Sequence, residues 1–268
     1  MTNSKNKPLY GDSFKKLIKE NTIIPMIGVY DIFSAALVAQ KFNTIFCSGY
    51  GFSASYYGLP DEGYIAWSDM VSYIGRIRSV LPYNKHIIVD IDDGYGDHKL
   101  AADVVKRLER LGVSGVIIED QRRPKKCGHL PGKEILELDE YMLRLNSVIK
   151  AKDNIFVIGR TDSPSFEDAL YRIIEFKKAG VDGVLVEGID DLSKISKIKD
   201  AVGDKIAITI NLIEGGNTEP ISWPELSSLG VKLVNYSTPC LFAAHGAINK
   251  KLQKLKNDNG SLLLDDDD

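Results

Sequence analysis

Residues 111–120, Leu-Gly-Val-Ser-Gly-Val-Ile-Ile-Glu-Asp, carry the clearest local signature of the fold. Gly112 follows a helical stretch, and glycine is typical of a helix C-cap because it tolerates the left-handed backbone conformation. The apolar run 115–118 then indicates a buried strand, which two acids terminate. The same joint, a glycine after a helix and then an apolar strand, recurs at 179–184 and 229–234. Repeated joints of this kind predict a fold in which helices and strands alternate.

The rest of the chain continues this alternation. The expected helices cover residues 12–20, 31–41, 68–80, 99–111, 139–152, 165–178, 190–201 and 241–255. The expected strands cover or begin at residues 23–28, 44–48, 86–91, 115, 155, 183, 206 and 231–234. Eight strand–helix units in about 250 residues match a (β/α)8 barrel, whose active site lies at the carboxyl ends of the strands. An open, doubly wound sheet is disfavoured because no Gly-x-Gly-x-x-Gly sequence follows the first strand.

The composition narrows the class of protein. Without a Pro-, Ser- or Gly-rich linker, we predict one α/β barrel domain at 12–256, a flexible N-terminus at 1–11 and an acidic disordered tail at 257–268. A total of 34 Lys and Arg against 37 Asp and Glu gives a net charge of -3, which disfavours nucleic acid or a membrane as partner. Three widely spaced cysteines without a CxxC pair fit a reducing compartment. Because the sequence shows neither a signal-peptide core nor a membrane-length apolar run, we expect a cytoplasmic protein that binds a small molecule.

Nearly every expected strand ends in a charged or amide residue. These residues are Asp90, Asp92, Glu119, Arg160, Glu187, Asn211 and, one turn further on, Glu214, and a serine, Ser48, follows the second strand. Carboxylates from neighbouring strands are oxygen ligands that suit Mg²⁺ or Mn²⁺, whereas the four histidines lack zinc-ligand spacing. The guanidinium fork of Arg160 can bind a substrate carboxylate or phosphonate in two places. Asp93, Asp97 and Asp162 are more simply interpreted as helix caps or turn acids.

The segment 119–133 after the fourth strand combines loop residues with reactive groups. Its cysteine, Cys127, is flanked by Lys125, Lys126 and His129, whose positive charge would favour the thiolate. Two glycines would let this loop bend and close over a site. The alternative interpretation is that this loop is a solvated basic connector in which the cysteine has no role. The acids Glu119 and Asp120 at the end of the preceding strand argue against that alternative.

Nine motifs occur in order between residues 10 and 250. They are Gly28-x-Tyr30-Asp31, Ser48-Gly49-Tyr50, Gly58-Leu59-Pro60-Asp61, Asp90-x-Asp92-x-Gly94-Tyr95-Gly96, Glu119-Asp120-Gln121, Lys125-Lys126-Cys127-Gly128-His129, Arg160-Thr161-Asp162, Asn211-x-x-Glu214-Gly215-Gly216 and Pro224-Glu225-Leu226. With these motifs the chain resembles the isocitrate lyase / phosphoenolpyruvate mutase superfamily. The resemblance implies a modified (β/α)8 barrel with a Mg²⁺ site that binds 2-oxo or 2-hydroxy acids and stabilises an enolate. It also implies that the last helix, the amphipathic segment 241–255, is swapped onto a partner in a homodimer or homotetramer; an ordinary eighth barrel helix is the alternative.

The resemblance further implies roles for individual residues. Asp90 would hold the metal directly. Three further acids would hold it through its waters, namely Asp92, Asp61 and Glu119. The residues that would bind the substrate are Ser48, Gly49, Tyr50, Arg160, Asn211 and Glu214. The residues that would act in catalysis are Cys127, Arg160, Glu119 and His129, with Cys127 as proton donor or acceptor at the carbon that is cleaved.

Within the superfamily, the loop cysteine favours a lyase because phosphoenolpyruvate mutases lack it. Ser48-Gly49-Tyr50, followed by Gly58-Leu59-Pro60-Asp61, resembles the branch that acts on 2-alkylmalates and oxaloacetate, which includes dimethylmalate lyase and petal death protein. We therefore expect a Mg²⁺-dependent carbon–carbon lyase acting on a substituted malate-type 2-hydroxy diacid or on oxaloacetate. A phosphonomutase is the main alternative, because the loop also resembles that of carboxyphosphonoenolpyruvate phosphonomutase. An oxaloacetate-cleaving hydrolase would share the metal and the enolate, whereas Cys127, Asp90, Glu119 and Arg160 together argue against a catalytically silent binding or oligomerisation module.

Overall fold

Eight short apolar segments form parallel strands, each paired with the next and the eighth paired with the first, so the sheet closes into a barrel. In this computed structural model the described residues are 9–128 and 132–260. The strands are β1 (Ile24–Val29), β2 (Thr44–Cys47), β3 (His86–Asp90), β4 (Gly115–Glu119), β5 (Phe156–Thr161), β6 (Gly183–Val186), β7 (Ala207–Leu212) and β8 (Val231–Tyr236). The predicted (β/α)8 barrel is confirmed.

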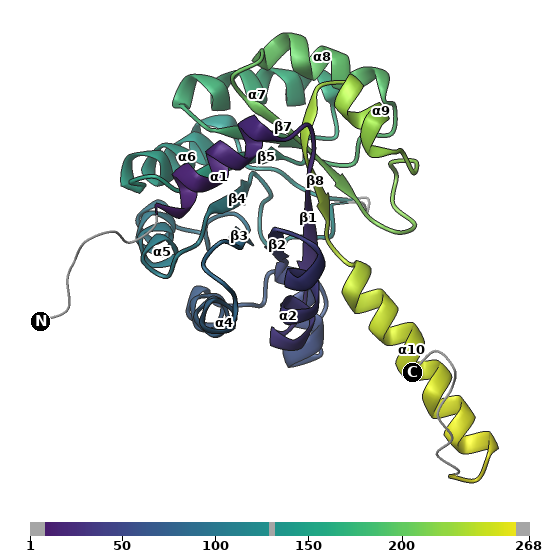
Figure 1. Cartoon of the computed structure of the whole chain (residues 1–268). Coiled ribbons are helices and arrows are strands. Elements are labelled where there is room, and N and C mark those ends of the chain that lie inside the picture. The colour runs from purple at the N-terminus through teal and green to yellow at the C-terminus, as the bar shows by residue number, and fades with distance from the viewer. Residues whose placement is uncertain (1–8, 129–131, 261–268) are drawn as a thin grey trace, which may run out of the picture.

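Helices surround the barrel and connect its strands (Figure 1). They are α1 (Tyr10–Glu20), α2 (Ile32–Lys41), α3 (Gly49–Phe52), η1 (Ser53–Tyr57), α4 (Trp67–Val80), α5 (His98–Arg110), α6 (Leu138–Ala151), α7 (Phe166–Ala179), α8 (Ser193–Val202), α9 (Trp223–Ser228) and α10 (Pro239–Asn257). The glycines of the three repeated joints, Gly112, Gly180 and Gly230, have φ of 88°, 93° and 90°. This left-handed conformation, which other residues adopt only at a cost, explains why glycine recurs there. Asp97 accepts hydrogen bonds from the first turn of α5, so its predicted capping role is confirmed.

Side chains fill the inside of the barrel because alternate residues of each strand point inward. The inner cluster consists of Phe14, Ile24, Met26, Phe46, Ile88, Ile117, Phe156, Ile158, Leu185, Ala207 and Leu233. Phe14 comes from α1, which lies across one end of the barrel in Figure 1, and its side chain is fully buried. The amino-terminal end is thus filled by apolar groups, which leaves the carboxyl ends of the strands for a site.

The last helix, α10, extends away from the barrel (Figure 1). None of its residues is buried, and Ile248 and Leu252 on its apolar side are each 58% exposed. In this structure α10 therefore does not pack lengthwise as an eighth barrel helix. The expected flexible terminus and acidic tail lie mostly outside the described residues, although Tyr10 and Gly11 already belong to α1. In the described part of the chain, no helix is long and apolar enough to cross a membrane.

Candidate active site

The inward-facing positions change from apolar to polar at the carboxyl ends of the strands. Asp90, Glu119 and Arg160 each stand two residues after an apolar member of the inner cluster, so they continue the inner rows of β3, β4 and β5. Glu119 and Arg160 are register partners across β4 and β5. The fold therefore gathers charged groups at one mouth of the barrel.

A lysine from the loop after β4 lies among the acids at this mouth. Lys125 Nζ is 2.5 Å from Asp92 Oδ1 and 3.2 Å from Asp61 Oδ1. The same nitrogen is 3.9 Å from Glu119 Oε1. These residues come from four different segments of the chain, so the acid cluster is a product of the tertiary fold.

The segment after β2 approaches the acid cluster from another side. Ser48 precedes α3, and its Oγ accepts a hydrogen bond from the backbone of that helix at 3.3 Å. A Cβ atom added to Gly49 would lie 3.3 Å from Asp92 Oδ1 and 3.4 Å from Asp90 Oδ2, so a side chain there would crowd both acids. Tyr50 and Ser48 line one cavity with Asp90. The structure thus brings these three substrate-binding candidates next to the metal-binding candidates.

Burial dominates the ionisation of the acid cluster. It raises the pKa of Asp90 and raises that of Glu119 well above the usual range, although Lys125 opposes both shifts. Burial alone would lower the pKa of Lys125, but the carboxylates of Asp92, Glu119 and Asp61 outweigh it, and the pKa is raised well above its usual value. Because the acids outnumber this lysine, a further cation would stabilise the cluster.

The residues present fit a magnesium ion. Both carboxylate oxygens of Glu119 are buried and accept no hydrogen bond from another described residue. The candidate metal ligands Asp61, Asp90, Asp92 and Glu119 are all carboxylates, whose oxygens suit Mg²⁺ or Mn²⁺. In the ranges that the structure covers, no three Asp, Glu, His or Cys side chains form a group that could hold an ion directly. This is compatible with Mg²⁺ that keeps several waters and takes one direct carboxylate, for which Asp90 is the candidate.

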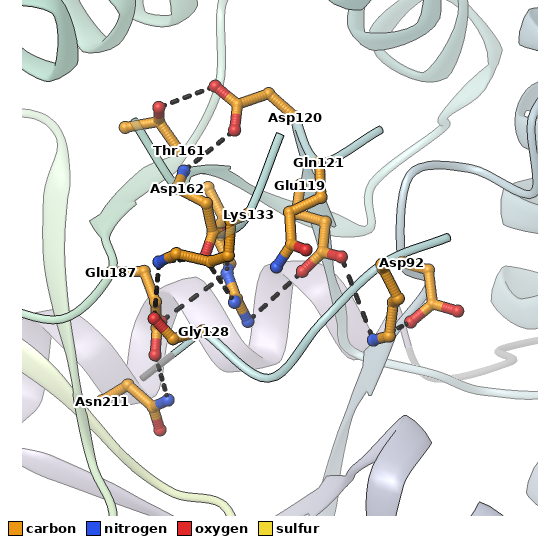
Figure 2. A network of polar contacts seen from close by, with 12 residues as sticks. Asp92, Glu119, Asp120, Gln121, Gly128, Lys133, Thr161, Asp162, Glu187 and Asn211 are labelled. Atoms are coloured by element: carbon orange, nitrogen blue, oxygen red, sulfur yellow. Dashed lines mark hydrogen bonds and ion pairs between the residues drawn. The ribbon is translucent and has the colours of Figure 1, made fainter. Parts of the chain in front are cut away.

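Arg160 is held by acids from three strand ends. Its Nε and Nη2 donate to Asp162 at 2.7 and 3.0 Å. Its Nη1 lies 3.4 Å from Glu119, and its Nε lies 3.6 Å from Glu187. Asp162 also accepts a hydrogen bond from Lys133 at 3.0 Å (Figure 2). The interpretation of Asp162 as a turn acid is therefore wrong, because its fully buried carboxylate pairs with two cations.

The distal substrate-binding candidates have different surroundings. Asn211 donates to Glu187 Oε1 at 2.7 Å, and Figure 2 shows the two side chains facing one another. The carbonyl oxygen of Asn211 accepts hydrogen bonds from Ser237 and Asn235 at 2.9 and 3.0 Å. Glu214 accepts a hydrogen bond from the N-cap threonine of α10 and is not among the described residues that line the cavity. Asn211 thus lines the cavity, whereas Glu214 contacts the lining residue Thr238, and its predicted role in binding the substrate stays a prediction.

Cys127 is partly buried and lines the cavity together with Asp90 and Arg160. The ammonium group of Lys125 lies among the acids, and that of Lys126 donates to a loop carbonyl at 2.8 Å. Both lysines thus have oxygen partners of their own, and their predicted effect on the thiol stays a prediction. His129 lies outside the described residues.

The cavity between these groups has a volume of about 90 Å³. Its polar lining includes Ser48, Tyr50, Asp61, Asp90, Lys125, Lys126, Cys127, Arg160, Glu187, Asn211, Ser237 and Thr238. Phe46, Ile213 and Phe242 supply an apolar part of the wall. A cavity of this size and polarity fits a small organic acid better than a large ligand.

Two further acids fix the strand ends around the site. Asp93 was expected to be a cap or turn acid, but its oxygens accept hydrogen bonds from Arg123 at 2.8 Å and from Arg144 at 2.6 Å, so that expectation is wrong. Asp120 points away from the inner row and accepts a hydrogen bond from Thr161 at 2.6 Å (Figure 2). Burial raises the pKa of Asp120 to about 6. Asp93 and Asp120 therefore hold the segments that carry the site residues in place through these hydrogen bonds.

Sequence reasoning did not assign roles to three residues of the site. Glu187 was noted only as a strand end, and Lys133 and Gln121 were given no role. Gln121 exchanges two hydrogen bonds of 2.9 Å with the backbone of Lys126 and so fixes the start of the loop. Glu187 ends an apolar strand in the same way as Glu119, and this pattern could have identified it.

Comparison with known proteins agrees with this geometry. The model of the phosphoenolpyruvate phosphomutase family matches residues 14–256. The chain belongs to this family. A phosphoenolpyruvate phosphomutase family fold therefore accounts for almost the whole described chain, and the resemblance inferred from the motifs is confirmed.

Individual relatives show the range of chemistry in the phosphoenolpyruvate phosphomutase family. The chain is 36% identical to the chloroplastic carboxyvinyl-carboxyphosphonate phosphorylmutase of Arabidopsis thaliana, with 92% of this chain and 75% of the relative covered. It is 34% identical to the petal death protein of Dianthus caryophyllus, with 90% of this chain and 77% of that protein covered. The solved structure of a 2,3-dimethylmalate lyase has a TM-score of 0.91 at 28% identity, with 98% of this chain and 89% of that chain covered. The family thus contains both lyases and mutases, and the chain has an enzyme's fold.

Proposed function

We propose that the chain is a Mg²⁺-dependent lyase that cleaves a carbon–carbon bond in a substituted malate-type 2-hydroxy diacid or in oxaloacetate. The main support is that a thiol, Cys127, lines the same cavity as Asp90 and Arg160. A proton donor, a candidate metal ligand and an arginine that binds carboxylates are the groups that such a cleavage requires. The similarity to a dimethylmalate lyase supports the same reaction class.

In the proposed reaction, Arg160 orients the substrate by one carboxylate. Because Asp162 occupies Nε and Nη2, the nitrogen left for the substrate is Nη1, which lies 3.4 Å from Glu119. When bound, Mg²⁺ supplies a Lewis acid that polarises the oxygen on C2 and stabilises negative charge. The segment from Ser48 to Tyr50 contacts the carboxylate next to C2.

Two proton transfers complete the cleavage. From a malate-type 2-hydroxy diacid, the proton of the C2 hydroxyl passes to a carboxylate of the acid cluster, and Glu119 is the candidate acceptor because its oxygens accept no hydrogen bond from the other described residues. Oxaloacetate has a carbonyl at C2, so water must first add there to supply this hydroxyl. The electron pair of the C2–C3 bond moves onto C3 and its carboxylate, so C2 becomes a carbonyl carbon. Cys127 then donates its Sγ proton to C3, which releases a 2-oxo acid and a second carboxylic acid.

The charge of the cavity favours a diacid over a triacid. Among the described lining residues, the cations are Lys125, Lys126 and Arg160. Lys125 is paired with the acid cluster, and Lys126 donates to a backbone carbonyl. Arg160 therefore remains to bind one carboxylate beyond the one next to C2, which matches a malate-type substrate.

A phosphonomutase is the second candidate function. The 36% identity to a phosphorylmutase favours it, and Mg²⁺ with Arg160 could equally hold a phosphonate. An oxaloacetate-cleaving hydrolase would use the same groups. A catalytically silent barrel is less well supported, because Cys127, Asp90 and Arg160 line a single cavity.

Product analysis with a substrate panel separates these functions. The protein would be incubated with Mg²⁺ and, in turn, alkylmalates, oxaloacetate and phosphonopyruvate, and the products identified by mass spectrometry. A 2-oxo acid and a second carboxylic acid from an alkylmalate are expected. Rearrangement of phosphonopyruvate to phosphoenolpyruvate, without turnover of the other substrates, would establish the mutase chemistry instead, and turnover of none would favour the silent module.

We also propose that α10 packs on a second copy of the chain in a homodimer or homotetramer. The apolar side of α10 is exposed, and Phe33 and Leu37 on α2 are 68% and 48% exposed. Exposed apolar faces of this kind are typical of subunit interfaces. Cys47, Cys127 and Cys240 form no disulfide, which is compatible with the proposed cytoplasmic location.

A further inference from the structure

The turn that carries Asp92 has an unusual backbone. Asp92 has φ of 48° and Tyr95 has φ of 63°, a left-handed conformation that residues with a side chain rarely adopt. Such a conformation persists only where surrounding contacts hold it. In this turn it directs Asp92 toward Lys125 and the acid cluster, while the next residue, Asp93, faces the helix layer. The contacts that hold this turn therefore determine where one metal-binding candidate lies.

Arg123 supplies several of these contacts from a different loop. Its Nε donates to Asp93 Oδ1 at 2.8 Å, and its Nη2 lies 3.4 Å from Asp92 Oδ2. Its guanidinium carbon is 6.0 Å from the centre of the Tyr95 ring. One side chain thus contacts both ends of the left-handed turn.

The same guanidinium also reaches the loop that carries another acid. Arg123 Nη1 donates to the carbonyl of Gly63 at 2.5 Å, two residues after Asp61. A Cβ atom at Gly63 would lie 2.9 Å from this nitrogen, so the backbone and the guanidinium are in close contact. Arg123 therefore joins the loop between η1 and α4, the turn after β3 and the loop after β4.

We propose that Arg123 is a positioning residue of the metal site, which holds Asp61 and Asp92 where they can contact the waters of Mg²⁺. This inference rests on the proposed metal site. Arg123 touches neither Asp90 nor any residue proposed to bind the substrate, so it acts through the two acids. Its role requires three donors in a fixed planar arrangement, which arginine has and lysine lacks.

The sign of the effect on metal affinity separates this role from simple charge neutralisation. A cation near a metal site repels the metal ion, so removing its charge alone would tighten metal binding. Removing a group that positions the ligands weakens metal binding, by about 10- to 100-fold for residues that contact the ligands. Positioning and charge therefore predict opposite outcomes for the same substitution.

The test measures Mn²⁺ binding to the full-length protein by electron paramagnetic resonance, which counts free Mn²⁺ without any substrate. The variants are Arg123→Gln, Arg123→Lys and a control, Arg122→Gln. Arg122 lies on the same loop, and its guanidinium pairs 3.4 Å away with the exposed Glu140. Arg122→Gln thus gives the same change in net charge without touching the acids.

We expect Arg123→Gln and Arg123→Lys both to weaken Mn²⁺ binding by at least tenfold. Circular dichroism should show the parent's fold in both variants, because Arg144 still pairs with Asp93. Arg122→Gln should bind like the parent. Tighter binding by Arg123→Gln, or parent-like binding by Arg123→Lys, would overturn the positioning role. If the parent itself binds no Mn²⁺, the proposed metal site fails and the inference fails with it; if the parent binds and the variants bind equally well, only the inference fails.

Discussion

Replacing Gly128 with alanine tests whether the loop that carries Cys127 is seated against the site. A Cβ atom there would lie 2.5 Å from Arg160 Nη2 and 2.5 Å from Glu187 Cγ, closer than carbon atoms normally approach. Neither side chain can move away easily, because Arg160 is bonded twice to Asp162 and Glu187 accepts a hydrogen bond from Asn211. The methyl group must therefore displace either the loop or the arginine.

The expected cost follows from this crowding. Inserting a methyl group into a packed site costs about 1–3 kcal/mol. If this free energy destabilises only the conformation in which the loop packs against Arg160, kcat/KM should decrease roughly 5- to 150-fold, since about 1.4 kcal/mol corresponds to a tenfold change. The preceding residue in the chain, Cys127, should at the same time become more accessible to reagents.

The assay compares Gly128→Ala with Gly75→Ala, a substitution in α4 whose new Cβ would have ordinary van der Waals contact, 3.9 Å, with Leu111 Cδ2. It measures kcat/KM on the best substrate of the panel and the alkylation rate of Cys127 by peptide mass spectrometry. We expect Gly75→Ala to keep the parent's activity and Gly128→Ala to lose activity while Cys127 alkylates faster. Parent-like kcat/KM in Gly128→Ala would refute the packing of this loop against Arg160.

Three further predictions concern the metal, the barrel and the assembly. Asp90→Ala should abolish Mg²⁺-dependent turnover with the fold intact by circular dichroism; full activity and metal affinity in this variant would contradict the assignment of Asp90. Burial lowers the pKa of His86 to about 4, so between pH 4 and about 6.5 the unfolded chain binds one more proton than the folded chain. As the pH decreases through this window, the free energy of unfolding should therefore fall by up to about 3 kcal/mol. Urea unfolding should show a shallower pH dependence in His86→Gln, and an unchanged slope would show that His86 is not the group involved. Multi-angle light scattering should find a dimer or tetramer, and a stable monomer at micromolar concentration would exclude the swapped α10.

The barrel and many of its site residues could be predicted from local patterns. The apolar runs, the glycines after helices and the acids at strand ends each reflect a rule that acts within a few residues. Because inward positions recur every second residue, the sequence placed Asp90, Glu119 and Arg160 at one mouth of the barrel, where the structure has them.

The charge pairs of the site could not be predicted in this way. Lys125 was expected to act on the nearby thiol, yet its ammonium group lies beside Asp92, 33 residues earlier in the chain. Asp93 and Asp162 were interpreted as caps or turn acids from their neighbours in sequence, but they pair with arginines. Such pairs depend on how loops from different strands meet, and no local periodicity encodes that arrangement.

The central claim is that Cys127 donates the proton that completes a carbon–carbon cleavage, and turnover by Cys127→Ser tests it most directly. Serine keeps the size and the hydrogen-bonding capacity of the side chain but is a much weaker acid. The account predicts that kcat falls by roughly 10²- to 10⁴-fold while KM stays near the parent value, because Arg160 and the metal site still bind the substrate. Near-normal kcat for Cys127→Ser, on a substrate that the parent cleaves well, would contradict the account.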